Sequence, residues 1–104
     1  MAKIGQPYSS GNWLVKEGSE EDFISRWTVF VEWSLENALG LETGILIRDS
    51  DNPRRFLSLG AWDTAGALQA WRQMPEFQEL FEACRELCDE VRVRSYTLAS
   101  APSK

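Results

Sequence analysis

Residues 41–62, LETGILIRDSDNPRRFLSLGAW, contain two apolar segments on either side of a polar turn. The segments at 41–49 and 54–62 are short and rich in Ile, Leu and Phe, which is typical of β-strands. Between them, residues 50–53 have the Ser, Asp, Asn and Pro composition of a turn. The stretch therefore predicts two strands joined as a hairpin.

A helix is predicted before the hairpin, over residues 19–40. Ser19 offers an N-cap, with Asp22 placed in the manner of a capping box, and Gly40 is a natural stop. Residues 10–15 precede the helix and are predicted to form the first strand. The helix has one apolar stripe at helical spacing, formed by Phe23, Ile24, Trp27, Phe30, Val31, Leu35 and Ala38.

Two further helices and a strand are predicted after the hairpin. Asp63 or Thr64 is expected to cap a short helix that runs to about Gln73, and Pro75 fits the first turn of the next helix. A last strand is predicted over residues 90–98. The third helix is expected to be amphipathic, with its apolar side formed by Phe77, Leu80, Phe81, Cys84, Leu87, Cys88 and Val91.

This order of elements predicts a ferredoxin-like βαββαβ fold of the α+β class. Right-handed crossovers would place the helices on one face of a four-stranded antiparallel sheet. We expect one such domain over residues 10–98, a flexible N-terminal arm over residues 1–9 and a disordered tail over residues 99–104.

The predicted strands carry apolar side chains on both faces. Successive apolar residues occur at 45–47 in the second strand and at 56–57 and 61–62 in the third. A sheet with one face in water would instead alternate polar and apolar residues. Arg92 and Arg94 do alternate with valines in the last strand, so one end of the second face is expected to be wet. Since nothing else in the chain can cover this face, a symmetric homodimer is predicted.

Composition argues against several classes of function. The chain has 104 residues and a net charge of −5, and an acidic domain repels phosphate backbones, so no nucleic-acid partner is expected. No apolar run approaches the roughly 20 residues that span a bilayer. The first residues also lack the apolar segment of a secretory signal. We therefore expect a cytoplasmic protein with no membrane partner.

Histidine is absent from the sequence. This removes most metal sites, Ser-His and Cys-His nucleophile systems, and His-ligated haem. Asp49, Asp51 and Asn52 resemble the start of a calcium loop, but the Gly and bidentate Glu that complete such a loop are missing. Cys84 and Cys88 fit reduced, buried thiols better than a disulfide framework. We expect no metal and no cofactor.

The aromatic residues are the main candidates for a ligand site. Trp62 ends a predicted strand, Trp71 lies one short helix later, and Trp27, Phe77 and Phe81 could lie opposite them. Two interpretations stay open at this point. The side chains could line a pocket for a flat apolar ligand, or they could form a tryptophan-rich core without a cavity.

Polar candidates for the site are fewer. Asn12, in the first predicted strand, could orient a carbonyl or an oxygen species, or could be an exposed strand residue. Arg54, Arg55 and Arg72 could receive an anionic group, or could be solvated surface residues. The acidic side chains show no obvious paired-carboxylate arrangement.

Several of these features together resemble the antibiotic biosynthesis monooxygenase family. They are Lys16-Glu17-Gly18-Ser19 between strand and helix, the hairpin, Trp62-Asp63-Thr64 at a strand end, the Trp71-x5-Phe77 spacing and a closing Tyr96-x-Leu98. The resemblance covers roughly residues 10–98. It implies a dimeric α/β barrel, in which two ferredoxin-like subunits pack their sheets together. It also implies a pocket between sheet and helices in each subunit.

The resemblance points to two kinds of chemistry. Some members resemble cofactor-independent monooxygenases that oxidise polyketide quinols with O₂, where the deprotonated substrate supplies the electrons. Others degrade haem with a first-strand Asn, a helical Trp and an iron-ligating helical His. Trp71 falls where that Trp falls, but Phe81 occupies the His position and Asn12 is offset by about one residue. A one-residue offset in a strand reverses the face, which argues against haem degradation.

We therefore predict a cofactor-free, monooxygenase-like oxidoreductase that binds an aromatic or quinone-like molecule. Asn12, Trp27, Trp62, Trp71, Phe77 and Phe81 would contact the ligand. Without histidine, Tyr8, Tyr96, a carboxylate or a perturbed lysine would have to act as the base, and the catalytic residues stay unassigned. The alternative is a non-catalytic ligand-binding or dimerisation module with the same fold.

Overall fold

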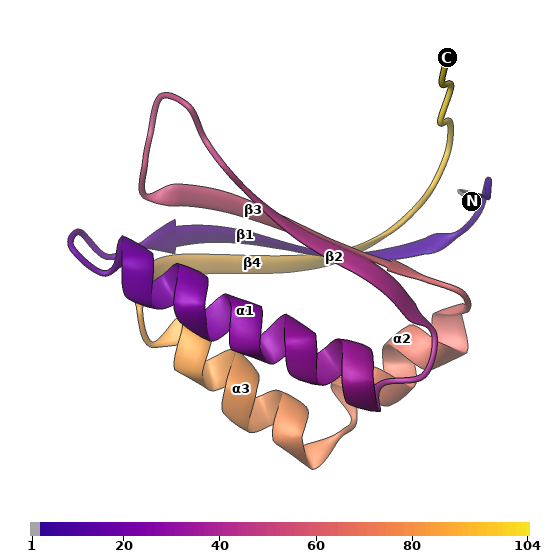
Figure 1. The fold of residues 1–104 in the computed structure, drawn as a ribbon, viewed down its shortest axis with the longest axis horizontal. Coiled ribbons are helices and arrows are strands. Elements are labelled where there is room, and N and C mark those ends of the chain that lie inside the picture. The colour runs from indigo at the N-terminus through magenta and orange to yellow at the C-terminus, as the bar shows by residue number, and fades with distance from the viewer. Residues whose placement is uncertain (1–2) are drawn as a thin grey trace.

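The computed structural model describes residues 3–104, which form a four-stranded sheet and three helices (Figure 1). In chain order the elements are β1 (Pro7–Val15), α1 (Glu20–Asn37), β2 (Leu41–Arg48), β3 (Arg55–Trp62), α2 (Ala65–Arg72), α3 (Pro75–Arg85) and β4 (Cys88–Thr97). The strands lie in the order β2-β3-β1-β4, and every neighbouring pair is antiparallel. Figure 1 shows the helices on one face of the sheet. The predicted ferredoxin-like fold is confirmed.

The hairpin between β2 and β3 closes through the predicted turn. The Asp49 carboxylate accepts hydrogen bonds from the backbone N–H groups of Asp51 (2.7 Å) and Asn52 (3.1 Å). This local bonding explains why an Asp at the end of a strand favours a turn. Over residues 3–104, no group of three His, Cys, Asp or Glu side chains is placed to hold a metal ion.

The register of β1 decides which side chains face the helices. Trp13 pairs with Phe56 of β3, and both rings are buried, each with 2% of its surface exposed. Side chains alternate between the two faces of a strand. Asn12 and its partner Leu57 therefore lie on the opposite face, which no helix covers. The core of the protein lies between the sheet and the helices.

Helix α1 contributes much of that core. Its buried residues are Phe23, Trp27, Phe30 and Ser34, which recur at intervals of four, three and four. Leu35 was predicted on the apolar stripe, but 46% of its surface is exposed because it lies beside the buried line. Ser19 is the N-cap residue, although its side chain makes no capping hydrogen bond, so the predicted capping box does not form.

The other helix starts agree with their sequence signals. Thr64 Oγ1 accepts a hydrogen bond from the Ala67 N–H (3.1 Å) at the start of α2, and Pro75 occupies the first turn of α3. In the part of the chain that the structure describes, no helix combines the length and the apolar character needed to cross a membrane.

Two strands, β1 and β4, begin more than one residue before their predicted starts because cross-strand pairing extends them. β1 begins at Pro7 instead of Ser10, so residues 7–9 of the predicted arm pair with β3 and β4. β4 begins at Cys88, which pairs with Val15, although the helical spacing continued to Val91. The helical spacing of apolar residues does not determine the structure here, because the segment is hydrogen-bonded to a neighbouring strand. Residues 99–104 form neither helix nor strand.

Candidate functional site

A continuous series of aromatic rings runs between the sheet and the helices. Successive ring centroids lie 4.6–5.6 Å apart, within the range of favourable aromatic pairs. Trp71 is a central member, since it contacts Phe30 (5.6 Å), Trp62 (4.9 Å) and Phe77 (4.6 Å). The series consists of Phe56, Phe23, Trp13, Phe81, Phe77, Phe30, Trp71 and Trp62.

The indole N–H groups in this series are each held by a serine. Trp13, Trp62 and Trp71 donate to the hydroxyl oxygens of Ser58 (3.1 Å), Ser9 (3.0 Å) and Ser34 (2.9 Å), respectively. Ser34 is fully buried and in turn donates to the backbone carbonyl of Phe30 (2.8 Å). A buried indole N–H without a partner would be costly, so these bonds fix the orientation of the rings.

A pocket of about 190 Å³ opens beside the rings, between the sheet and helices α2 and α3; we call it the aromatic pocket. Its apolar lining consists of Gly11, Trp13, Phe30, Trp71, Phe77, Phe81 and Val93. Its polar lining residues are Ser9, Ser10, Arg72 and Gln78. Apolar walls with a few polar groups are typical of small-molecule sites.

The structure divides the predicted aromatic residues between a pocket and a core. Trp71, Phe77 and Phe81 line the aromatic pocket. Trp62 is fully buried and Trp27 is 8% exposed. These two line a separate cavity of about 40 Å³, which is too small for an organic ligand. The structure thus contains an aromatic-lined pocket beside a core with buried tryptophans.

Asn12 lies apart from the aromatic pocket. It is exposed on the uncovered face of the sheet, and its Oδ1 accepts a hydrogen bond from Arg55 Nη1 (2.8 Å). It lines a charged hollow of about 600 Å³ there, together with Arg92 and Glu90. The alternation of a strand allows only one face for each residue, and Trp13 takes the face toward the helices. Asn12 is therefore not placed to contact a ligand between sheet and helices.

Some lining residues were not predicted from the sequence. Phe30 belongs to the buried stripe of α1, so its helical spacing from Trp27 was an available signal. Gly11 has a steric role that only packing reveals. A Cβ at this position would lie 2.6 Å from Trp13 Nε1 and 2.8 Å from Ser58 Oγ. The missing side chain thus leaves room for the indole and its hydrogen bond.

Arg72 supplies a positive charge at the aromatic pocket. It lies in the last turn of α2, and its Nη1 donates to Ser95 Oγ of β4 (2.9 Å). Desolvation by burial lowers the pKa of the Arg72 guanidinium, although an arginine stays protonated at neutral pH. The two other predicted arginines are engaged elsewhere, since Arg54 pairs with Asp89 and Arg55 pairs with Glu90.

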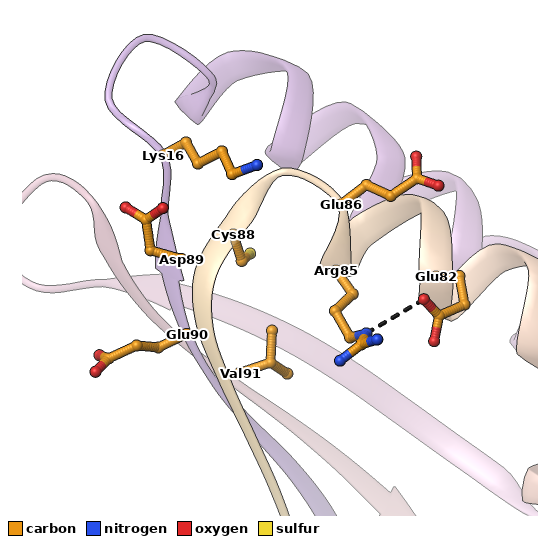
Figure 2. A pocket seen from close by; sticks show the side chains of 8 residues that line it. All are labelled: Lys16, Glu82, Arg85, Glu86, Cys88, Asp89, Glu90 and Val91. Carbon is orange, nitrogen blue, oxygen red and sulfur yellow. Dashed lines mark hydrogen bonds and ion pairs between the residues drawn. The ribbon is translucent and has the colours of Figure 1, made fainter.

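Another hollow, of about 380 Å³, lies between the end of α3 and the start of β4 (Figure 2). Figure 2 shows acidic and basic side chains spread around it, with one ion pair drawn between Arg85 and Glu82 (3.2 Å). Burial raises the pKa of the Cys88 thiol to about 11 and that of Cys84 to about 12. Such thiols are not thiolates at neutral pH, so neither is a ready nucleophile. The aromatic pocket is the better candidate site.

Comparison with known proteins gives a family and a fold. The family model described as antibiotic biosynthesis monooxygenase matches residues 11–83. A search of curated proteins found no significant match.

Solved structures match over nearly the whole chain. SnoaB, a cofactor-independent oxygenase from Streptomyces nogalater, superposes with a TM-score of 0.86 at 16% identity, covering 96% of this chain and 99% of that one. A candidate antibiotic biosynthesis monooxygenase from Bordetella bronchiseptica gives 0.80 at 23% identity, covering 92% and 99%. A conserved protein from Methanosarcina mazei gives 0.81 at 20% identity, covering 91% and 94%. At these identities the structures show a shared fold.

Proposed function

The chain belongs to the antibiotic biosynthesis monooxygenase family, since the family model matches residues 11–83, and from this premise we propose that it binds an aromatic or quinone-like molecule as an oxygenase-like protein. The observation that carries the proposal is the aromatic pocket. Its ring walls, from Trp71, Phe77 and Phe81, suit a flat ligand, and serine hydroxyls hold neighbouring indoles in place. Prearranged walls lower the entropy cost of binding.

The pocket would act mainly by orienting and desolvating its substrate. Among the described lining residues there is no carboxylate, lysine or tyrosine. Tyr8 and Tyr96, considered as bases from the sequence, pair with each other in the register of β1 and β4 and share the uncovered face with Asn12. A phenol-type substrate would therefore enter as its anion, or ionise with help from the nearby Arg72 charge.

The proposed reaction needs only the substrate and O₂. The substrate anion would supply electrons to O₂, as a naphthol does when it becomes a naphthoquinone. One oxygen atom would enter the ring, and the other would leave as water together with two hydrogens from the substrate. In this scheme the protein contributes position and a dry environment.

Oxygen uptake with a panel of naphthol-type and hydroquinone-type substrates tests this proposal. We expect uptake above the buffer rate, and we expect Trp71→Ala to lower it at least tenfold because Trp71 forms the pocket wall and the ring contacts around it. Trp33→Ala is the matched control, since Trp33 lies on α1 outside the pocket lining.

The absence of an acid–base residue from the described pocket lining favours a second function, a non-catalytic ligand-binding module. The same panel separates the two. Binding to wild-type protein without oxygen uptake, measured by tryptophan fluorescence, would support the module and overturn the oxygenase. Failure of every compound to bind would overturn both.

We also propose that two copies associate through the uncovered face of the sheet. Ile45 and Ile47 on this face are 48% and 50% exposed, and Leu57 and Leu59 lie beside them on β3. A contiguous apolar surface of this kind is unusual on a monomer. A second sheet packed on it would cover the apolar half, as in a dimeric α/β barrel.

The dimer predicts a clear effect of a charge placed on its apolar face. Ile47→Asp is expected to shift the protein from twice the mass of one chain to the mass of a single chain, because a buried aspartate without a partner is strongly unfavourable. Light scattering after gel filtration, with each protein measured over the same dilution series, gives these masses. Leu39→Asp, at a 90% exposed position near the C-terminal end of α1, should leave the mass unchanged. A wild-type protein with the mass of one chain at all concentrations would contradict the dimer.

We place the protein in the cytoplasm. Cys84 and Cys88 are both free thiols, and Cys84 is fully buried in the core. Unpaired cysteines are typical of proteins in a reducing compartment.

A further inference from the structure

Arg72 is the one half-buried arginine of the described chain that has no ion pair with a carboxylate. Arg54 and Arg55 are buried to a similar degree, and each has an acidic partner, at Asp89 and Glu90. Partly buried charges are normally compensated in this way. The Arg72 charge therefore lacks a compensating anion within the protein.

The position of Arg72 directs this charge to the aromatic pocket. Its neighbour in sequence, Trp71, forms a wall of the pocket, and Arg72 itself is among the lining residues. The Ser95 hydroxyl accepts one hydrogen bond from Nη1 and so ties the side chain to β4. A guanidinium has five N–H donors, so this single side-chain bond leaves donors free for a planar anion. Burial also lowers the pKa of the Arg72 guanidinium, which agrees with a charge that lacks compensation.

The size of the aromatic pocket limits the ligand. Its volume is about 190 Å³. An apolar cavity of roughly 150 Å³ holds benzene, while pockets for drug-sized molecules begin near 300 Å³. The available space fits one or two fused aromatic rings with a small substituent.

We propose that the aromatic pocket selects a one- or two-ring aromatic carboxylic acid, with the ring against Trp71 and Phe77 and the carboxylate paired with Arg72. This inference rests on the proposed ligand-binding function and names the class of ligand. The arginine fork matches the two oxygens of a carboxylate, which adds geometric selectivity to the charge attraction. The aromatic walls alone would accept neutral molecules of the same shape.

The decisive experiment compares 2-naphthoate with 2-naphthamide, which have the same shape and differ in charge. Binding to wild-type protein is followed through the indole N–H signals in NMR, where the signal of Trp71 is assigned by its loss in Trp71→Phe. We expect 2-naphthoate to bind at least tenfold more tightly than 2-naphthamide. The preference should shrink as salt is raised, since ion pairing at a partly exposed site is screened.

Variants test whether Arg72 causes the preference for 2-naphthoate over 2-naphthamide. Arg72→Gln should bring the two affinities within about twofold of each other while 2-naphthamide binding is retained, and Arg72→Lys should restore part of the difference. Arg85→Gln is the matched control, because it removes the same charge from an exposed position paired with Glu82 on α3. If Arg72→Gln does not fold, Ser95→Ala, which frees Arg72 from β4, should reduce the preference instead.

The possible outcomes separate this inference from the proposed function. Equal binding of 2-naphthoate and 2-naphthamide would overturn selection by Arg72 and leave the aromatic pocket as a site for neutral ligands. A preference that persists unchanged in Arg72→Gln would also overturn it. If neither compound shifts the Trp71 signal while a naphthol of the oxygen-uptake panel does, the inference is wrong and the aromatic pocket still binds ligand. If none of these compounds shifts it, both the inference and the proposed ligand site are wrong.

Discussion

Replacement of Phe23 by alanine is expected to lower the free energy of unfolding by about 3–5 kcal/mol, the range for truncating a buried phenylalanine. Phe23 is fully buried, and its ring lies 5.2 Å from Trp13 and 5.1 Å from Phe56. These contacts join α1 to the two central strands, so the cavity left by the substitution would lie between the layers. Close packing on both sides leaves little room for the cavity to collapse.

Urea denaturation followed by tryptophan fluorescence, at one fixed protein concentration, measures this loss. Leu39→Ala is the control, because Leu39 is 90% exposed and its truncation should change stability by no more than about 0.5 kcal/mol. A loss below about 1 kcal/mol for Phe23→Ala would contradict the close packing of α1 on β1 and β3.

Gly40→Ala is expected to lower the free energy of unfolding by about 2–5 kcal/mol, because it combines two separate costs. Gly40 has a φ of +91°, a conformation that costs a residue with a side chain about 1–2 kcal/mol. An added Cβ would also meet Asp63 Oδ1 and lie 2.7 Å from Ala67 Cβ. Overpacking of this kind costs about 1–3 kcal/mol. The turn after α1 is held against the start of α2, since Asp63 N–H donates to the Gly40 carbonyl (2.9 Å).

Gly18→Ala is the matched control for this prediction. Gly18 has nearly the same φ, +89°, but a Cβ there would meet nothing within 4 Å. Gly18→Ala should therefore lower the free energy of unfolding only by the cost of the backbone conformation, about 1–2 kcal/mol. The difference between the two urea midpoints measures the steric part. Equal losses of stability in Gly40→Ala and Gly18→Ala would mean that the turn at Gly40 moves away from Asp63 and Ala67 at little cost.

The aromatic residues serve stability and the candidate site together. Trp62 and Trp27 are buried in the core, whereas Trp71 contacts Trp62 on one side and forms the wall of the aromatic pocket on the other. A substitution at Trp71 would therefore affect both packing and ligand binding. For this reason the test of ligand class uses Arg72, whose side chain is not part of the series of packed rings.

Much of the fold could be predicted from the sequence because its signals are local. The Asp49 turn, the Thr64 cap and Pro75 at the start of α3 depend on bonds within a few residues, and all three occur as expected. The apolar residues on both faces of the strands also predicted a second covering layer. The family resemblance rested on the hairpin and on short motifs along the chain, and it is confirmed by the family model over residues 11–83.

Tertiary packing decided the rest, since strand register and pocket shape depend on residues far apart in the chain. Alternation along β1 divides the residues into two sets, but only the pairing of Trp13 with Phe56 under the helices determines that Asn12 faces away. Pairing with Val15 likewise makes Cys88 the start of a strand. Arg72 could be named from the sequence, but its lack of an acidic partner and its place at the aromatic pocket arise only when α2 meets β4. Charge compensation is a property of neighbours in space, and the hairpin that decides the fold carries no information about it.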